Sequence, residues 1–338
     1  MKYCLFLFCL PFFILACNKS DEEIIPSGNQ FSETILEGFD VVSIAFDNEG
    51  NAWIGTYNWA IDTNYPELIK YNRKSTEIQV YNSTNSLIED GSFIWDIAVD
   101  DQDNIWIGSD GLVKFDGTNF SKFTTKNSDI PVGYVHDIIV DSNKSVWFSS
   151  SSHLEGGLVK YDGTSWTVYT PENSDLPYNG VRSVAIDRED NIWLALYRTV
   201  NESALVKIDK NNWTVYDSNN FGFTPYLFGN IQINSKNQVC ASIDYTFSDV
   251  PHNGPQFFIF DEISTQKIQY DNELNITRIV TDEHDTIWGI GTNVFVIFDG
   301  EKWIVDDTTF KDLYINTIER SPDKKIWIGT SNGIYIYG

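Results

Sequence analysis

The sequence is poor in cysteine and in histidine, with four of each in 338 residues. Cys4 and Cys9 lie in an apolar N-terminal run and Cys17 follows it directly, which leaves Cys240 as the only thiol in the rest of the chain. No disulfide can form within that remainder, so a large core must stabilise it.

Basic residues are also scarce. The chain has 23 Lys and Arg against 48 Asp and Glu, which gives a net charge of −25. Nucleic-acid binding requires clusters of Lys and Arg that neutralise phosphates, and the sequence has no such clusters, so we expect no nucleic-acid partner. The acidic balance favours solubility at a crowded surface and, as a second interpretation, a preference for neutral or cationic ligands.

Long helical patterns are missing as well. No segment shows the 3.6-residue apolar period over the length of a sizeable helix, and no apolar run after the N-terminus is long enough to span a membrane. Short alternating runs separated by Gly, Asn and Asp occur throughout, and 15% of the residues are aromatic. This pattern predicts an all-β protein.

The N-terminus has the features of an export signal. Residues 1–16 contain an apolar run of signal-peptide length, and the segment from Ile14 to Cys17 resembles the lipobox of bacterial lipoproteins. The resemblance implies cleavage before Cys17 and its acylation, with residues 17–27 as a polar tether. The acidic run in this tether resembles a surface-export signal. We therefore expect an outer-membrane lipoprotein that contacts the membrane through its lipid only, on the cell surface or alternatively on the periplasmic side.

A repeat occupies the remainder of the chain. An acidic turn that leads into an aliphatic strand with a central Trp, as in Asp187 to Leu194, occurs seven times. Cys240 replaces the Trp in one copy, so we expect a small buried residue there and not a nucleophile. The marker positions lie 39 to 53 residues apart and are Trp53, Trp106, Trp147, Trp193, Cys240, Trp288 and Trp327. This period is typical of propeller blades or of another repeat array.

The third copy shows the complete unit. Its predicted strands are 135–140, 145–149, 158–161 and 166–169, and turns rich in Asp, Asn and Gly join them. Four antiparallel strands in each copy make one propeller blade.

The two ends of the chain complement each other. The last copy stops after a third strand, Ile334 to Tyr337, whereas Gly28 to Thr34 matches the fourth strand of an earlier copy, Gly117 to Phe123. We therefore predict one seven-bladed β-propeller over residues 28–338, in which the N-terminal strand completes the last blade and removes an open sheet edge.

The repeat resembles that of the propeller sensors of two-component regulators. The segments that carry the resemblance are Asn104 to Gly108, Gly157 to Gly163, Asn173 to Pro177 and Val181 to Asp187. It implies a ligand-sensing propeller whose ligands bind on the face formed by the loops after the second and fourth strands. Sensors of this family usually carry fourteen blades, a membrane helix and a kinase. With seven blades and neither of the others, we expect a monomer that would need a membrane sensor or a surface-complex protein as partner.

Four of the loops after second strands are extended. They are 57–67, 150–156, 197–203 and 244–255. Three of them belong to consecutive blades, the third to the fifth, so one sector of this face is built up. Loops on a rigid scaffold are where binding residues concentrate.

Aromatic residues dominate these loops and their neighbours. Aromatic rings beside acids and amides suit sugar rings or peptide side chains, so we predict non-catalytic binding of a carbohydrate or a peptide, without a cofactor. The alternative is that several of these residues only pack their own loops. The candidate ligand-binding residues are Tyr57, Trp59, His153, Tyr178, Tyr197, Arg198, Phe223, Tyr226, Tyr245, Phe247 and His252, and Tyr134 and Phe221 occur in the same loops.

Metal binding and catalysis are weaker interpretations. Calcium prefers oxygen ligands, but the acidic turns vary at the ligand spacing, and turn formation explains them better. His136 lies early in a first strand and His284 in an acidic turn, whereas His153 and His252 lie in extended loops and could act as bases or metal ligands.

Two alternatives to simple binding stay open. The fold resembles seven-bladed lyases that act on cyclic peptide antibiotics with a His and a metal, but their motif residues have no match here. We therefore assign no catalytic residue and no metal site, and a propeller lyase or hydrolase that uses His153 or His252 is the alternative. A scaffold in a surface complex is a third hypothesis, which predicts a broad apolar patch.

Overall fold

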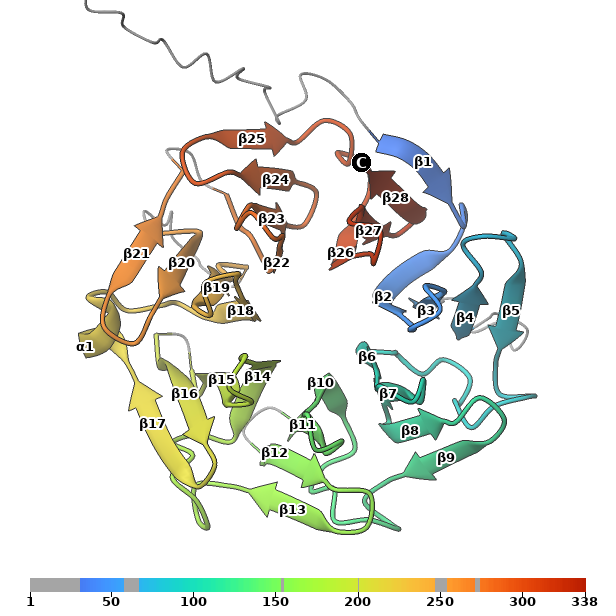
Figure 1. Ribbon diagram of the computed structural model, residues 1–338, viewed down its shortest axis with the longest axis horizontal. Coiled ribbons are helices and arrows are strands. Elements are labelled where there is room, and N and C mark those ends of the chain that lie inside the picture. Colours follow the sequence, from blue (N-terminus) through green and yellow to red (C-terminus); the bar gives the residue numbers. More distant parts are fainter. Residues whose placement is uncertain (1–30, 58–66, 153–154, 200, 247–253, 271–273) are drawn as a thin grey trace, which may run out of the picture.

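The computed structural model describes residues 31–57, 67–152, 155–199, 201–246, 254–270 and 274–338. These residues form seven four-stranded antiparallel sheets arranged around an axis, as Figure 1 shows. The predicted seven-bladed, all-β propeller is confirmed. No helix in the described ranges is long and apolar enough to cross a membrane.

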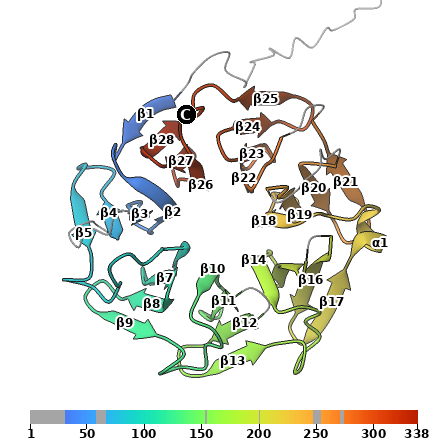
Figure 2. The same cartoon turned by 180° about the vertical axis from the view of Figure 1, so that it is seen from behind.

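The first four blades follow one another clockwise in Figure 1 and anticlockwise in Figure 2, which views the ring from behind. Blade 1 contains β2 (Asp40–Phe46), β3 (Ala52–Tyr57), β4 (Leu68–Tyr71) and β5 (Ile78–Tyr81). Blade 2 contains β6 (Asp96–Val99), β7 (Ile105–Ser109), β8 (Gly111–Phe115) and β9 (Phe120–Phe123). Blade 3 contains β10 (Val135–Val140), β11 (Val146–Ser152), β12 (Glu155–Tyr161) and β13 (Trp166–Tyr169). Blade 4 contains β14 (Gly180–Ile186), β15 (Ile192–Tyr197), β16 (Ser203–Asp209) and β17 (Asn212–Tyr216).

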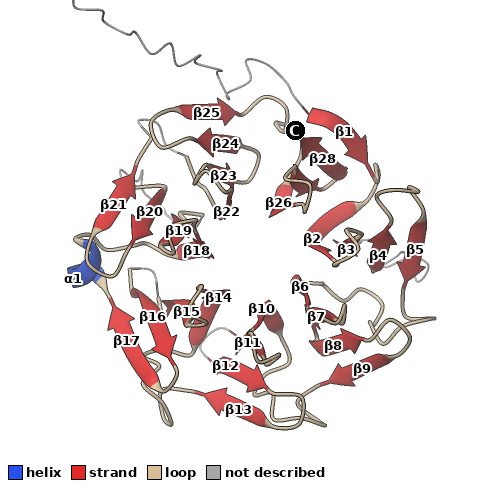
Figure 3. Cartoon of the chain, in the orientation of Figure 1, coloured by secondary structure: helices blue, strands red, loops and turns tan. Residues whose placement is uncertain are grey.

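A single helical turn, α1 (Ser218–Phe221), precedes the last three blades and is coloured blue in Figure 3. Blade 5 contains β18 (Phe228–Ile233), β19 (Val239–Ile243), β20 (Phe257–Phe260) and β21 (Thr265–Ile268). Blade 6 contains β22 (Arg278–Thr281), β23 (Ile287–Ile290), β24 (Phe295–Phe298) and β25 (Trp303–Asp306). Blade 7 contains β26 (Ile315–Arg320), β27 (Ile326–Thr330), β28 (Gly333–Tyr337) and β1 (Phe31–Ile35).

The two ends of the described chain close the ring. β1 pairs antiparallel with β28, with Phe31 opposite Tyr337 and Ile35 opposite Ile334. Blade 7 thus takes its outer strand from the N-terminal side and its other three from the C-terminal end, as predicted. Phe31 also packs against Phe310, with ring centroids 5.2 Å apart, so the closing strand is held by side chains as well as by its backbone.

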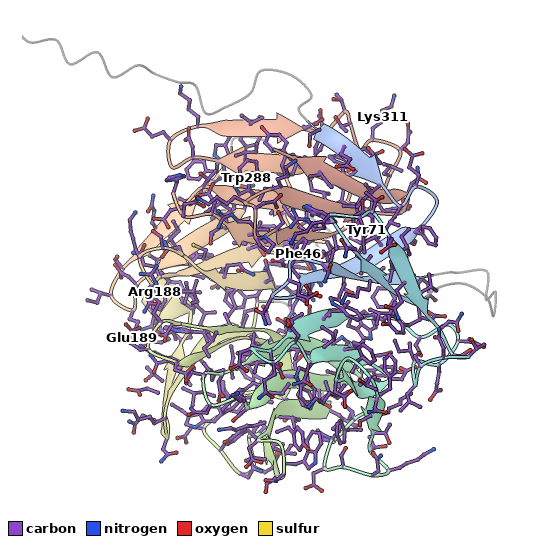
Figure 4. The ribbon with its side chains drawn as sticks, turned by 45° about the vertical axis from the view of Figure 1, so that its right-hand side comes forward. Phe46, Tyr71, Arg188, Glu189, Trp288 and Lys311 are labelled. Atoms are coloured by element: carbon purple, nitrogen blue, oxygen red, sulfur yellow. The ribbon has the colours of Figure 1, made fainter. Side chains whose placement is uncertain are left out.

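The core lies between successive sheets. Figure 4 shows side chains filling the spaces between blades, with Phe46 and Tyr71 inside the ring wall and Arg188 and Glu189 at its surface. Phe46 of blade 1 meets Trp327 of blade 7 edge to face at a centroid distance of 5.2 Å. We call the face with the turns between first and second strands the turn face, and the opposite face the loop face.

The acidic turns of the turn face fix the repeated Trp residues. Asp187 accepts hydrogen bonds from the backbone N–H groups of Glu189 and Asn191 and from Trp193 Nε1 at 3.0 Å. We call this arrangement the Asp–Trp clasp. It also joins Trp53 to Asp47 (3.1 Å), Trp106 to Asp100 (3.1 Å), Trp147 to Asp141 (2.9 Å) and Trp288 to Asp282 (3.3 Å).

The clasp uses the acidic oxygens for structure, which supports the turn interpretation over calcium binding. Burial raises the pKa of Asp47, but hydrogen bonds from Asn51 and Trp53 and the charge of Lys70 outweigh burial and lower this pKa overall. No group of three or more His, Cys, Asp or Glu suited to hold a metal ion occurs in the described part of the chain.

Two blades lack the clasp. In blade 5 Asn234 and Cys240 take the positions of Asp and Trp, and Cys240 is buried, as predicted for this thiol. In blade 7 Ser321 replaces the Asp, and the buried Trp327 Nε1 has no hydrogen-bond partner among the described residues.

The lysines of the third strands have a packing role that the sequence did not indicate. Lys114 Nζ lies 5.0 Å from the Trp106 ring centroid and Lys160 Nζ lies 4.7 Å from the Trp147 ring centroid. Lys70 and Lys207 make the same contact in blades 1 and 4. Each lysine therefore covers the Trp of its own blade with a cation–π contact.

One predicted loop is wrong. Residues 150–152 and 155–156 continue the hairpin of β11 and β12, with Ser150 opposite Gly157 and Ser152 opposite Glu155. Similarly, Tyr197 pairs with Ser203 across β15 and β16. Hydrophobic alternation stops at these serines, so the sequence pattern indicated a loop where backbone pairing alone extends the strands.

Candidate functional site

The inner strands line an axial channel with two cavities. The loop-face pocket has a volume of about 290 Å³ and the turn-face cavity about 740 Å³. The two share Asp137, Asn230 and Arg278, which therefore lie at the waist between them. The loop-face pocket is lined by Trp95, His136, Asp137, Val181, Arg182, Tyr197, Gly229, Asn230, Thr277 and Arg278.

One strand position supplies the most polar part of this pocket. Trp95, His136 and Arg182 each stand five residues before the first Asp of the following turn, so the repeat places them side by side at the loop-face end of blades 2, 3 and 4. In the remaining blades the same position holds Val42, Gly229, Thr277 and Asn316. Because all seven residues differ, this position is not fixed by the repeat.

Aromatic rings lead from the rim of blade 1 to this pocket. Tyr57 contacts Phe93 at a centroid distance of 5.1 Å, and Phe93 contacts Trp95 at 4.2 Å. Trp95 in turn meets His136 edge to face at 4.7 Å, and Tyr134 lies 6.4 Å from His136. We call these five residues the aromatic row. Tyr134 is 45% exposed, so the row is accessible at that end.

Arg182 is held in place by a buried carboxylate. Its Nη2 lies 2.5 Å from Asp244 Oδ2, and Asp244 is 2% exposed. Asp244 also accepts a hydrogen bond from the backbone N–H of Thr246 at 2.8 Å. An ion pair whose carboxylate is buried and hydrogen-bonded is directionally well defined, so the Arg182 guanidinium has a preferred orientation at the pocket wall.

Tyr197 lines the pocket at the end of β15, in the same blade as Arg182. A Cβ on Gly180 would lie 2.2 Å from the Tyr197 carbonyl oxygen and 3.0 Å from its ring, so only glycine permits this close approach. Gly229 has the same function on the next blade, since a Cβ there would lie 2.1 Å from the Thr277 carbonyl oxygen. Gly180 thus lets two strands of blade 4 lie close together at the pocket, and Gly229 lets blade 5 approach blade 6.

A row of hydrogen-bond acceptors from blades 2 to 5 stabilises the waist of the channel. Asp96 accepts the backbone N–H of Ile138 and Asp137 that of Val184, both at 2.8 Å. Ser183 accepts the N–H of Ile231 at 3.2 Å, and Asn230 that of Ile279 at 2.8 Å. Each of these residues stands four positions before its turn and binds the first strand of the next blade. Blades 2 to 5 therefore use this position to connect to the following blade.

Two carboxyl groups in the channel, Glu319 and Asp96, have raised pKa values. Burial raises the pKa of Glu319 to about 7, and Arg278 only partly offsets this effect. The pKa of Asp96 is well above its usual range, first because of burial and then because of repulsion from Asp137. The channel therefore carries less negative charge at neutral pH than its residues suggest.

The predicted site residues that the structure describes do not gather in one cluster. Tyr197 lines the loop-face pocket, and Tyr57 belongs to the aromatic row. Tyr226 stacks on Tyr245 with centroids 5.7 Å apart, and Tyr245 is only 9% exposed. Arg198 is exposed directly after Tyr197.

Two other candidates pack against buried clusters, in agreement with the alternative of loop packing. Tyr178 contacts the core between blades 3 and 4. Phe223 contacts the core of blade 5, where Phe221 of α1 is also buried. Four candidates and the predicted lipidation site lie outside the described residues; they are Trp59, His153, Phe247, His252 and Cys17.

Sequence reasoning missed Trp95, Arg182 and Arg278 and set His136 aside as an early strand residue. A signal for them exists in the sequence. When the seven first strands are aligned on their acidic turns, the positions four and five residues before the turn hold charged, aromatic and small residues within otherwise aliphatic strands. The extended loops are the more conspicuous feature of the sequence, and the candidate residues were taken from them and not from the strand residues that face the axis.

Comparison with known proteins identifies the repeat. The two component regulator propeller family matches residues 36–58 and 87–111, the segments that contain the first two strands of blades 1 and 2. The resemblance noted in the sequence is thereby confirmed, with two segments of the chain matching this family. No curated protein sequence matches significantly.

Solved structures of low sequence identity share the fold. The extracellular domain of BT3049 from B. thetaiotaomicron, assigned to the hybrid two component systems, is 18% identical with a TM-score of 0.67 over 92% of this chain and 40% of its own. Virginiamycin B lyase from Staphylococcus aureus is 12% identical with a TM-score of 0.69 over 92% of this chain and 98% of its own. PorZ, a surface component of the type-IX secretion system of Porphyromonas gingivalis, is 13% identical with a TM-score of 0.59 over 88% and 46%.

These likenesses show the fold alone. The chain spans about 40% of the length of the BT3049 extracellular domain and 46% of PorZ. It spans nearly the whole lyase chain.

Proposed function

We propose that this chain is a non-catalytic binding propeller that receives a glycan or a peptide at the loop-face pocket. The observation that carries the proposal is the aromatic row, which ends at a concave pocket with the oriented guanidinium of Arg182. Rings that stack on aromatic faces and polar groups that converge from several blades are typical of sites for sugars and peptide side chains.

The proposal includes the location of the protein in the cell. The lipobox at Cys17 and the polar tether that follows it support a lipid-anchored protein of the outer membrane, displayed on the cell surface. The shared fold with an extracellular sensor domain and with a surface secretion component agrees with an envelope location. In this arrangement the propeller passes ligand occupancy to a membrane sensor or holds the ligand within a surface complex.

The test is ligand-dependent thermal unfolding of the full chain purified in detergent. Neutral and acidic oligosaccharides and short peptides are screened, because a ligand that binds only the native state raises the melting temperature by mass action. Trp95→Ala should abolish the shift, since it interrupts the aromatic row at the pocket. Tyr314→Ala is the matched control, because Tyr314 is 69% exposed outside the row. No shift with any compound, or an equal loss in both variants, would refute the proposal.

A propeller lyase or hydrolase is the second candidate function. His136 in the pocket and the likeness to virginiamycin B lyase favour it. The same screen separates the two functions when it is repeated with EDTA and followed by mass spectrometry of the ligand. An intact ligand and an EDTA-independent shift support binding, whereas a cleaved ligand or a shift that EDTA abolishes supports the enzyme.

A further inference from the structure

Arg278, in blade 6, stands next to the row of acceptors at the waist of the channel but cannot continue it. It stands four residues before its turn, the position at which Asp96, Asp137 and Asn230 accept a backbone N–H from the next blade. A guanidinium has only donors and cannot perform this structural role. The repeat therefore gives no reason for an arginine at this position.

The other part-buried arginines of the chain are all neutralised. Arg73 pairs with Asp323, Arg182 with Asp244 and Arg320 with Glu283. Within the described ranges Arg278 has no ion pair or side-chain hydrogen bond, and it acts on Asp96 and Glu319 through charge alone. Arg278 lines both cavities, so it borders the space that a ligand would enter.

The groups around Arg278 define the chemistry of a ligand. The loop-face pocket brings together the side chains of Arg278, Arg182 and His136, whereas Asp137 is its only described carboxylate. One oxygen of Asp137 already accepts the N–H of Val184 at 2.8 Å. A complementary ligand presents an anionic acceptor to Arg278 and a neutral donor, such as a hydroxyl or an amide N–H, to Asp137.

We infer that the ligand of the loop-face pocket carries a carboxylate, which the Arg278 guanidinium binds through two parallel N–H···O hydrogen bonds while Trp95 contacts the adjoining ring or side chain. Planar guanidinium and carboxylate groups match in this way, and the pairing is strong where water is excluded. This inference rests on the proposed function and narrows it. It also runs against the acidic balance of the whole chain, which by itself favours neutral or cationic ligands.

Two sources supply a carboxylate beside a hydrogen-bond donor. One is an acidic sugar, whose hydroxyl groups adjoin its carboxylate. The other is the C-terminus of a peptide, whose last N–H adjoins the terminal carboxylate. The inference concerns the chemistry that the two have in common, and the experiment distinguishes the sources.

The test is isothermal titration calorimetry of the full chain in detergent with two matched pairs of probes. The first pair is a trimer of galacturonic acid and its methyl ester, and the second is the peptide Gly-Gly-Trp with a free and with an amidated C-terminus. We expect the acid of at least one pair to bind about tenfold or more tightly than its neutral partner, because the ester and the amide cannot form the charged pair. The pair that shows this preference identifies the source.

Variants assign the preference to Arg278. Arg278→Gln should remove it, and Arg278→Lys should reduce it about tenfold, since lysine keeps the charge but loses the planar fork. Arg188→Gln, an exposed turn-face change, is the matched control and should leave the preference unchanged. Because the comparison of acid and neutral probes is made first on the unaltered protein, the test does not depend on the folding of any variant.

Each outcome decides the question. The inference is wrong if neither acid binds, if the neutral partner binds equally or better, or if the preference persists in Arg278→Gln. Binding of neutral probes that Trp95→Ala abolishes would leave the proposed function standing while this inference fails. If no probe of any class binds, both the proposed function and this inference are wrong.

Discussion

On the turn face five of the seven blades carry the same Asp at the same place, whereas on the loop face the position that reaches the pocket holds seven different residues. The Asp oxygens accept hydrogen bonds from their own turn and from a Trp, as in Asp187 and Trp193. The loop-face residues, such as Trp95 and His136, contact residues of other blades and the pocket. Repetition thus marks the residues that build each blade, and variation marks those available for a ligand.

Removal of a clasp should have the largest effect on stability. Asp187→Ala leaves the buried N–H groups of Asn191 and Trp193 without an acceptor, so we expect the free energy of unfolding to fall by about 3 kcal/mol. Denaturant unfolding measures the loss. Asn234→Ala in blade 5, where no Trp donates, should cost about half as much. Equal losses would mean that the Trp hydrogen bond contributes nothing.

The channel carboxyl of Glu319 should make stability depend on pH. The fold raises this pKa from 4.5 to about 7 by burial, which favours the protonated form. The contribution of Glu319 to the free energy of unfolding is therefore fully present below about pH 4.5, where the carboxyl is protonated. It is lost as the pH rises through 7 and the buried carboxyl ionises. Glu319→Gln should remove this loss and stabilise the protein by about 2 kcal/mol at pH 8, with little change at pH 4.

Thermal unfolding across this pH range provides the measurement for Glu319. Glu301→Gln, which changes an exposed carboxyl on blade 6, is the control and should leave the pH profile as it is. A Glu319→Gln profile parallel to that of the unaltered protein would show that this carboxyl ionises normally.

Restoring the missing clasp of blade 7 should have a smaller, stabilising effect. Ser321→Asp places an acceptor at the position that serves Trp193 in blade 4, and the buried Trp327 Nε1 at present has no partner in the described chain. We expect a gain of about 1 kcal/mol in the free energy of unfolding. The double variant Ser321→Asp, Trp327→Phe should lose this gain, and a gain that persists would point to the turn itself.

The smallest effect on stability is expected on the loop face. Tyr134→Ala removes an exposed ring at the end of the aromatic row, so the free energy of unfolding should change by less than about 0.5 kcal/mol. Ligand affinity in the screen described above should nevertheless fall. A loss of stability comparable to that of Asp187→Ala would remove the distinction between the two faces.

The fold could be predicted because its determinants repeat. Each acidic turn and Trp strand is a local pattern, and seven copies of about the same length leave little choice of architecture. Closure was also visible, since β1 and β28 each match part of a complete blade. Registers were less accessible, because the pairing of Ser150 and Ser152 in blade 3 depends on backbone hydrogen bonds and not on hydrophobic alternation.

The candidate site was harder to predict because it is not local. Trp95, His136, Arg182 and Arg278 come from four blades and meet only when the ring closes around the axis. Each is a single non-aliphatic residue in an aliphatic strand. Such a residue forms no recognisable motif when one segment is considered by itself. Long loops gave a stronger signal, yet some of their aromatic residues, such as Phe223, contact the core.

The pairing of β1 with β28 joins residues 31 and 337, which are at opposite ends of the described chain. Contacts between such distant segments carry the largest loop-closure entropy and form slowly. During synthesis the first six blades can assemble in order, but the seventh must wait until the last strand has emerged from the ribosome. Until that moment β1 has no partner, and apolar residues of blade 6 that pack against blade 7, such as Phe295 and Ile297, are uncovered, which makes this interval the period of greatest risk of aggregation.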